Sequence, residues 1–264
     1  MAALSKQPLA LRLLLPASCA IPYLLISWPL HLLCAAWLAL YLLLPVAVAT
    51  LLWLAAKLDP QRQGHLIDFL VLLLLGLAVD LRWFEPAWPH ALVAMNKVLL
   101  LDVGLYGFLV IRQLDGVGFD LRWRLTDWKI GLRELLFYMP IAVALGLAIG
   151  FLHWHGHINR PWLLPGSWLF TYLLIALPEE IFFRGWMQNL FECRIGRTAS
   201  LVVTAILFGL SHFNKRAAHF NWRYVLLAAI AGIFYGRAWR SDRRIAASSI
   251  THACVDTIWG ALLR

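Results

Sequence analysis

Ionisable side chains lie inside otherwise apolar segments of this 264-residue chain. A charged group costs free energy in hydrocarbon, so one found within a membrane segment is usually functional. One set is an acidic pair followed by an arginine, and the other two sets each contain a histidine. The six ionisable residues are Glu179, Glu180, Arg184, His212, His252 and Asp256.

Helical spacing makes each set a unit, because residues four positions apart share one face of a helix. Glu180 and Arg184 have this spacing, so the arginine can neutralise a carboxylate of its own helix in a low dielectric. His252 and Asp256 form a second pair with the same spacing, and His212 follows a phenylalanine by four positions. The alternative for each set is structural: an intrahelical ion pair, an interfacial histidine, or a pair near a helix start.

The depth of these residues predicts that they meet. The plausible turn between Glu179 and His212 is the segment Arg194–Arg197. At 1.5 Å per residue, Glu179 and His212 each lie roughly 23 Å from that turn, so an antiparallel hairpin brings them to one level. The third motif lies about 12 to 18 Å beyond the preceding basic loop. We therefore expect three helices to deliver the acidic and imidazole groups to one chamber.

This set of side chains suits hydrolysis. A carboxylate with an imidazole can bind and deprotonate water, and a second histidine with a hydrogen-bonding partner can stabilise an oxyanion. Ser248 and Ser249 lack a paired base at helical spacing, so neither is a convincing nucleophile. Zinc is the alternative, with Glu179, His212 and His252 as ligands. Because the zinc motif His-Glu-x-x-His is absent, we expect no cofactor.

The composition places the chain in a membrane. Hydrophobic residues make up 62% of it and charged residues 14%, with a mean hydropathy of +0.73, so lipid is the solvent. The net charge of +9 comes from basic loops between apolar runs, as the positive-inside rule expects. No basic domain is present, so nucleic acid is not an expected partner. The composition favours a multi-pass protein of a bacterial inner membrane.

The predicted fold is all-α, a polytopic transmembrane helix bundle of about eight spans, with seven to nine allowed. We expect 1–264 to form a single integral membrane domain, with the catalytic core helices at 167–260 and no diagnostic motif in 1–154. The segment 116–134 mixes tryptophan with arginine and lysine and predicts an interfacial amphipathic helix or loop. The candidate spans are Leu9–Trp28, His31–Ala55, Ile67–Leu81, Ala91–Ile111, Leu135–Trp154, Trp168–Phe191, Thr198–His212, Tyr224–Trp239 and Ile245–Leu263.

The motifs resemble those of the CAAX-processing and bacteriocin-processing family of intramembrane proteases, also called the Abi family. That family carries Glu-Glu-x-x-x-Arg, then Phe-x-x-x-His, then His-x-x-x-Asn or Asp, on successive helices. The resemblance covers about residues 167–260 and rests on the order of the motifs on apolar helices. The matching residues here are Glu179, Glu180 and Arg184, then Phe208 and His212, then His252 and Asp256.

The resemblance implies a glutamic-type intramembrane endopeptidase. By position, Glu179 is the general base and His212 its partner on the catalytic water. His252 and Asp256 would form the oxyanion site, while Glu180 and Arg184 would order the site. An ionised Asp256 cannot donate a hydrogen bond to an oxyanion, so it would either orient His252 as an imidazolium donor or be protonated.

The expected substrate is a membrane-anchored peptide or a C-terminal signal peptide, reached from the lipid bilayer. Two other functions remain open. One is a non-catalytic membrane immunity or scaffold protein that keeps the motifs for structure. The other is a proton-coupled transporter with Glu179 and His212 as a proton relay. The full hydrolytic set favours the peptidase over both.

Overall fold

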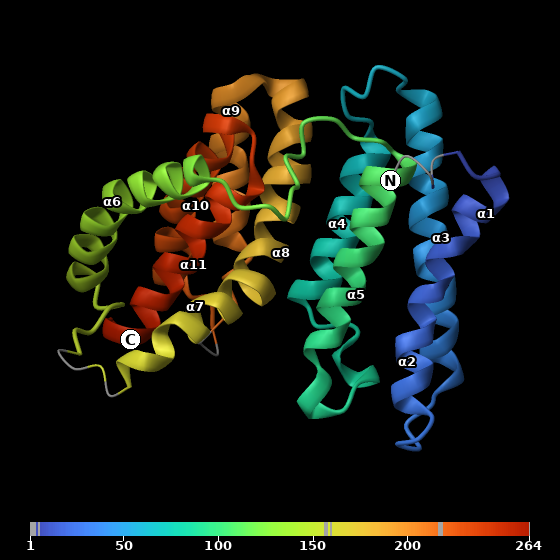
Figure 1. The fold of residues 1–264 in the computed structure, drawn as a ribbon, viewed down its shortest axis with the longest axis horizontal. Coiled ribbons are helices and arrows are strands. Elements are labelled where there is room, and N and C mark those ends of the chain that lie inside the picture. The colour runs from blue at the N-terminus through green and yellow to red at the C-terminus, as the bar shows by residue number, and fades with distance from the viewer. Residues whose placement is uncertain (1–3, 5, 156–157, 159, 216–218, 264) are drawn as a thin grey trace. The chain divides into compact units, whose positions relative to one another are not determined.

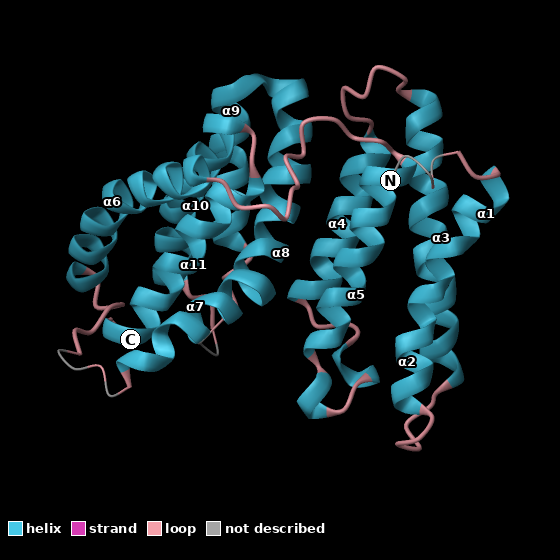
Figure 2. Ribbon diagram, viewed as in Figure 1, coloured by secondary structure: helices cyan, strands magenta, loops and turns pink. Residues whose placement is uncertain are grey.

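The computed structural model describes residues 4, 6–155, 158, 160–215 and 219–263. Helices and connecting loops make up all of these described residues, and no strand occurs among them (Figure 2). The predicted all-α class is therefore confirmed. The chain divides into two compact units, residues 1–115 and residues 116–264.

The N-terminal unit consists of helices α1 to α5 (Figure 1). Its buried aromatic core contains Tyr23 and Tyr41, whose rings stack at 5.1 Å, and Trp88, whose indole N–H donates to the Tyr41 hydroxyl at 2.6 Å. A π-helical segment, Tyr106–Ile111, continues α5. The helices are α1 Leu9–Leu14, α2 Ala20–Ser27, α3 Ala35–Leu58, α4 Leu66–Asp80 and α5 Ala94–Leu105.

Arg112 is buried in this unit and ties three segments together. Its guanidinium bonds Asp68 on α4 at 2.9 Å and Asp59, just after α3, at 2.6 Å. Burial opposes ionisation of Asp59, but the backbone N–H of Gln63 and the Arg112 guanidinium outweigh it and lower the pKa of this carboxyl. Both carboxylates lie against the Arg112 guanidinium within the unit and join the start of α4 to the end of α3, so this cluster is structural.

The C-terminal unit consists of α6 to α11. π-Helical segments Tyr172–Ala176 and Ile181–Gln188 link α7, α8 and α9 into one helical stretch. Gly196 (φ +78°) breaks that stretch, which confirms the turn predicted at Arg194–Arg197. The helices are α6 Leu125–Ala148, α7 Leu164–Thr171, α8 Leu177–Glu180, α9 Asn189–Leu210, α10 Trp222–Asp242 and α11 Ile245–Leu262.

Helices α9 and α10 approach closely through small residues. A Cβ added to Gly209 would lie 2.5 Å from the Val225 carbonyl oxygen, and one added to Gly232 would lie 3.0 Å from the Ala205 Cα. Small residues allow such approach between membrane helices, where dispersion replaces the hydrophobic effect as the driving force. The contact brings the C-terminal end of α9 against the first half of α10.

Helix α6 begins earlier than the sequence predicted. The expected span began at Leu135, with 116–134 as a separate interfacial element, but 125–134 form the first turns of α6. The Asp127 carboxylate explains this start, because it accepts the Arg124 backbone N–H at 2.8 Å and binds Arg244, which immediately precedes α11. The two ends of this contact are far apart in the sequence, so local patterning did not reveal it.

Several helical stretches are long and apolar enough to cross a membrane, and the protein is an integral membrane protein. The predicted spans at 67–81, 224–239 and 245–263 are also helical, as α4, α10 and α11. Helix α4 has only 15 residues, which is short for a membrane span. Helices α10 and α11 carry the polar groups described below, so their composition does not mark them as membrane spans. The five that do stand out are Leu9–Ser27, Ala35–Leu58, His90–Ile111, Leu125–Ala148 and Pro161–Leu210.

Candidate active site

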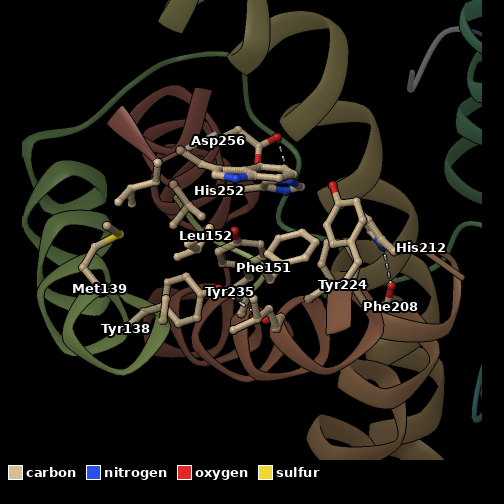
Figure 3. Close-up of a pocket in the computed structure, with 17 residues that line it drawn as sticks. Tyr138, Met139, Phe151, Leu152, Phe208, His212, Tyr224, Tyr235, His252 and Asp256 are labelled. Carbon is tan, nitrogen blue, oxygen red and sulfur yellow. Dashed lines mark hydrogen bonds and ion pairs between the residues drawn. The ribbon is translucent and has the colours of Figure 1, made fainter. Parts of the chain in front are cut away.

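The structure brings the motif residues together at the meeting point of α8, the end of α9, α10 and α11. Glu179 and Glu180 end α8, and Arg184 lies in the π-helical segment that follows. His212 lies just beyond α9, while His252 and Asp256 lie on α11. Figure 3 shows His212 and His252 on the wall of one pocket, with Asp256 beside His252.

Glu180 and Arg184 form the closed centre of the site. Both side chains are fully buried, and Arg184 Nε lies 3.1 Å from Glu180 Oε2. The other carboxylate oxygen of Glu180 lies 2.9 Å from His252 Nδ1, and the Arg184 guanidinium donates to the Gly232 carbonyl at 3.0 Å. The pair therefore joins α8, α10 and α11.

Aromatic rings surround the Arg184 guanidinium. Its Cζ lies 4.6 Å from the Phe208 ring centroid and 5.4 Å from that of Tyr235. Such contacts stabilise a cation that has lost its water. Phe208 thus has a packing role in the second motif, beneath the arginine of the first.

Two aromatic rings and a hydrogen bond at Nδ1 hold the His252 imidazole in place. Tyr235 stacks on the imidazole at 4.6 Å with an interplanar angle of 16°, and Phe208 meets it edge-on at 5.6 Å. A carboxylate accepts hydrogen bonds, so the contact with Glu180 assigns a hydrogen to His252 Nδ1. The Nε2 atom faces Asp256 Oδ2 at 3.6 Å and Glu179 Oε2 at 3.9 Å. The surroundings complement an imidazolium.

His212 is held in a defined tautomer by its own helix. Its Nδ1 lies 2.8 Å from the Phe208 carbonyl oxygen, which can only accept, so Nδ1 carries the hydrogen. In the neutral ring Nε2 is then a hydrogen-bond acceptor. The imidazole packs 4.9 Å from the Phe208 ring and 4.7 Å from that of Tyr224. This arrangement leaves a basic nitrogen for a small polar ligand such as water.

Glu179 differs from its neighbour Glu180 in exposure. The Glu179 side chain is 27% exposed, whereas that of Glu180 is 0% exposed. Lys215 Nζ lies 3.9 Å from Glu179 Oε1, and His252 Nε2 lies 3.9 Å from Glu179 Oε2. Both distances exceed that of a direct hydrogen bond. Glu179 is thus the accessible carboxylate of the pair.

A cavity of about 60 Å³ adjoins the two histidines and Asp256. It has room for a few water molecules. The three residues of the first motif, Glu179, Glu180 and Arg184, do not line this cavity, although Glu179 Oε2 lies 3.9 Å from His252 Nε2. The wall is largely aromatic and aliphatic and includes Tyr138, Phe151, Tyr224, Tyr235 and Trp259.

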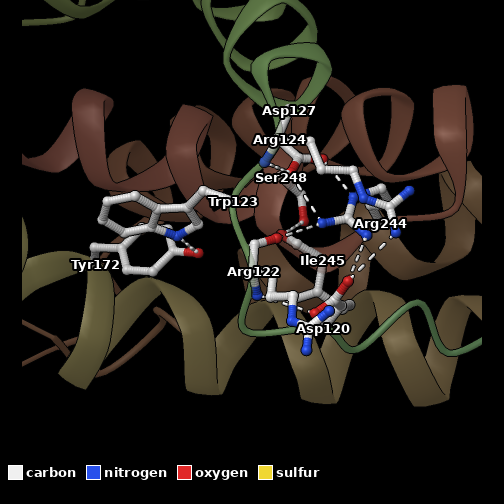
Figure 4. Close-up of polar contacts among 9 residues, drawn as sticks. All are labelled: Asp120, Arg122, Trp123, Arg124, Asp127, Tyr172, Arg244, Ile245 and Ser248. Atoms are coloured by element: carbon white, nitrogen blue, oxygen red, sulfur yellow. Dashed lines mark hydrogen bonds and ion pairs between the residues drawn. The ribbon is translucent and has the colours of Figure 1, made fainter.

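A polar network fixes the start of α11, on which His252 lies. Arg244 binds the two oxygens of Asp127 at 2.6 and 3.0 Å and reaches Asp120 at 3.1 Å (Figure 4). The backbone N–H of Arg122 and the Arg244 guanidinium lower the pKa of Asp120, and the hydrogen bond to Asp127 raises the pKa of Arg244. The Ile245 N–H donates to the Gly118 carbonyl at 3.0 Å. These contacts set the position of α11.

Comparison with protein-family models matches residues 161–258 to the type II CAAX prenyl endopeptidase Rce1-like family. The matched range contains every motif residue described above. Over this range the chain is similar to the CAAX-protease family. Comparisons with curated proteins and with solved structures found no match. The family supports a general assignment as a CAAX-type intramembrane endopeptidase.

The described residues contain no group of three His, Cys, Asp or Glu side chains placed to hold a metal ion together. Glu179, His212 and His252 therefore do not form a preassembled ligand set here. None of the four cysteines forms a disulfide, and Cys254 accepts a hydrogen bond from the Trp168 indole at 3.2 Å. Cys254 is half-buried and packs as a small apolar residue.

Sequence reasoning missed two residues that contact the motif side chains, Tyr235 and Lys215. Tyr235 stacks on His252 from α10, and no spacing rule relates the two positions. Lys215 follows His212 by three positions, in the turn after α9. This short separation in the sequence could have revealed Lys215, because a basic residue three positions from a predicted catalytic histidine must lie near the same chamber.

Proposed function

We propose that this protein hydrolyses a peptide bond of a membrane-associated substrate with a water molecule activated by Glu179 and His212. The observation that carries the proposal is the division between adjacent glutamates. Glu180 is fully buried and contacts Arg184 and His252 Nδ1. Glu179 is partly exposed and lies near His252 Nε2. A buried paired carboxylate suits support, and an accessible one suits proton transfer.

In the proposed first step, Glu179 takes a proton from the water and His212 Nε2 accepts a hydrogen bond from its other O–H. The water oxygen forms a bond to the carbonyl carbon of the substrate, and the carbonyl π electrons move to the carbonyl oxygen. The Phe208 carbonyl keeps His212 in the tautomer that this role requires. Phe208 is therefore a positioning residue for His212 through its backbone.

The tetrahedral oxyanion then needs a donor that is in place before charge develops. His252 Nε2–H suits this role, because Glu180 fixes Nδ1 and Tyr235 fixes the ring plane. Asp256, at 3.6 Å, would support the imidazolium electrostatically. On collapse the carbon–nitrogen bond breaks, and protonated Glu179 returns its proton to the leaving nitrogen. The products are a carboxylic acid and an amine, with one water consumed.

The substrate we propose is a membrane-anchored peptide or a C-terminal signal peptide, and the location is a bacterial inner membrane. The apolar lining beside the histidines favours a substrate that approaches from lipid. We propose that the reaction needs no metal, since an oriented carboxylate and imidazole can activate water themselves. In this scheme zinc would be an alternative way to activate the same water.

Cleavage in membrane vesicles tests the proposal. Peptides ending in CAAX-type sequences would be incubated with wild type, Glu179→Ala and His212→Ala, and the products identified by mass spectrometry. We expect cleavage by wild type and a loss of about 100-fold or more in each variant. Unchanged cleavage in both folded variants would contradict the peptidase proposal and favour the scaffold or transporter alternative.

A chelator titration tests the metal-free mechanism separately. We expect activity to survive exhaustive chelation, with an unreactive chelator analogue as the matched control. Activity lost on chelation and restored by zinc would instead favour a zinc-activated water at the same residues.

A further inference from the structure

The carboxylates at the site, including Glu179, are nearly equal in number to the cations around them. The carboxylates are Glu179 and Glu180 from α8 and Asp256 from α11. Arg184 neutralises Glu180 at 3.1 Å, and His252 faces all three carboxylates through its two nitrogens. With His252 as an imidazolium, these groups still carry one negative charge in excess. Lys215 supplies the further cation among the described residues that contact Glu179.

Lys215 is well placed to act on Glu179. Its Nζ lies 3.9 Å from Glu179 Oε1, and its side chain is 34% exposed. The residue lies in the turn after α9, three positions beyond His212, so the hairpin fixes its backbone near the site. The contact leaves the other Glu179 oxygen facing His252. Lys215 thus flanks the carboxylate on the side away from α11.

We propose that Lys215 is a positioning residue that holds Glu179 ionised and oriented as the general base, an inference that rests on the proposed function. A nearby cation favours the charged form of a carboxylate, and neighbouring carboxylates disfavour it. Among the described residues, Lys215 and His252 contact Glu179 directly. The other titratable or charged groups of the same cluster are Glu180, Arg184, His212 and Asp256.

Without Lys215, the carboxylates outnumber the cations among the described residues of the site, and Glu179 is the accessible carboxylate of the glutamate pair. It would then take up a proton at higher pH than in the wild type. A protonated Glu179 cannot accept a proton from water, so the enzyme would lose rate on the acid side and recover it at higher pH. A role confined to folding would not move the pH profile in this way.

The experiment measures kcat/KM against pH for the full-length protein in vesicles. Lys215→Met is the test variant, with Lys215→Gln as a second neutral replacement and Lys215→Arg as the conservative one. Arg223→Met is the matched control, because Arg223 is an exposed nearby cation whose guanidinium contacts the Gly150 carbonyl at 3.4 Å.

We expect the acid limb of Lys215→Met and Lys215→Gln to move to higher pH by about one unit. Lys215→Arg should restore the wild-type limb, and Arg223→Met should leave it in place. Profiles of both neutral variants that superimpose on wild type, or activity lost equally at every pH, would overturn the role of Lys215. An equal shift in Arg223→Met would overturn it too, because general surface charge would then be the cause.

Glu179→Gln separates this inference from the proposed function. Retained cleavage in Glu179→Gln would overturn the proposed function and the Lys215 role together. Loss of cleavage in Glu179→Gln, combined with an unshifted Lys215→Met profile, would overturn the Lys215 role alone.

Discussion

At the scale of single residues, environment separates two chemically identical neighbours. Glu180 has no exposed side-chain surface and contacts both Arg184 and His252, whereas Glu179 retains 27% exposure. Removing one partner of a buried ion pair leaves an uncompensated charge, which is strongly destabilising. Removing an accessible carboxylate has a much smaller effect on stability.

Substitution of the two glutamates should therefore separate stability from activity. We expect Glu180→Gln to lower the free energy of unfolding by about 3 to 5 kcal/mol, because Arg184 is left buried without its counter-charge. We expect Glu179→Gln to change it by less than about 1 kcal/mol while abolishing cleavage. Equilibrium unfolding in mixed micelles measures both. Equal destabilisation by the two variants would contradict the division of roles.

The sequence allowed most of the residue set to be predicted but not the contacts that orient it. Helical spacing and depth predicted that Glu179 and His212 lie at one level and that His252 reaches the same chamber, because helix rise is nearly constant. The stacking of Tyr235 on His252 depends on how α10 packs against α11, and local periodicity carries no such information.

At the scale of elements, glycine contacts set the approach of α9 and α10. We expect Gly209→Ala to destabilise the protein by about 1 to 3 kcal/mol, because its Cβ would lie 2.5 Å from the Val225 carbonyl oxygen. Gly260→Ala is the matched control, since a Cβ there meets nothing within 4 Å. Thermal unfolding in detergent measures the effect. A Gly209→Ala variant as stable as Gly260→Ala would show that the helices can separate without cost.

The arginine before α11 offers a second test at this scale. We expect Arg244→Met to lower the free energy of unfolding by about 3 to 5 kcal/mol, because buried Asp127 loses its counter-charge. Lys129→Met, which removes an exposed cation from the same region, should change it by less than about 0.5 kcal/mol. Chemical unfolding of both variants in mixed micelles compares them.

The ion pairs of Arg244 with Asp120 and Asp127 should weaken in acid. The folded-state pKa of Asp120 is lowered, so its contribution is present above the ordinary carboxyl pKa and is lost as pH falls through the folded pKa. A free energy of unfolding that does not depend on Arg244 would contradict this account of how α11 is anchored. So would a free energy of unfolding that stays unchanged as pH falls through the folded-state pKa of Asp120.

Helix boundaries were predicted correctly where they depend on neighbouring residues in the sequence. The turn at Arg194–Arg197 followed from a glycine between basic residues, and Gly196 has the positive φ that glycine tolerates. The start of α6 was predicted ten residues late because its anchor is a contact with Arg244, 117 positions away. Long-range ion pairs decide such boundaries, and one sequence alone does not reveal them.

At the scale of the whole molecule, the chain has two compact units, and the family match lies within residues 116–264. In the N-terminal unit, Arg112 forms ion pairs with Asp59 and Asp68. This unit contains none of the motif residues. Its apolar helices explain the membrane composition, while the proposed chemistry belongs to the C-terminal unit. The sequence predicted the membrane fold and the motif region, but not the division at residue 115.

The central claim is that Glu179 and His212 act together on one water molecule. A double-mutant cycle on peptide cleavage in vesicles tests it most directly, using Glu179→Gln, His212→Ala and their combination. Residues that act as a unit are strongly non-additive, so we predict that kcat/KM of the double variant matches that of the worse single variant. A loss in the double variant equal to the product of the single losses would contradict the account.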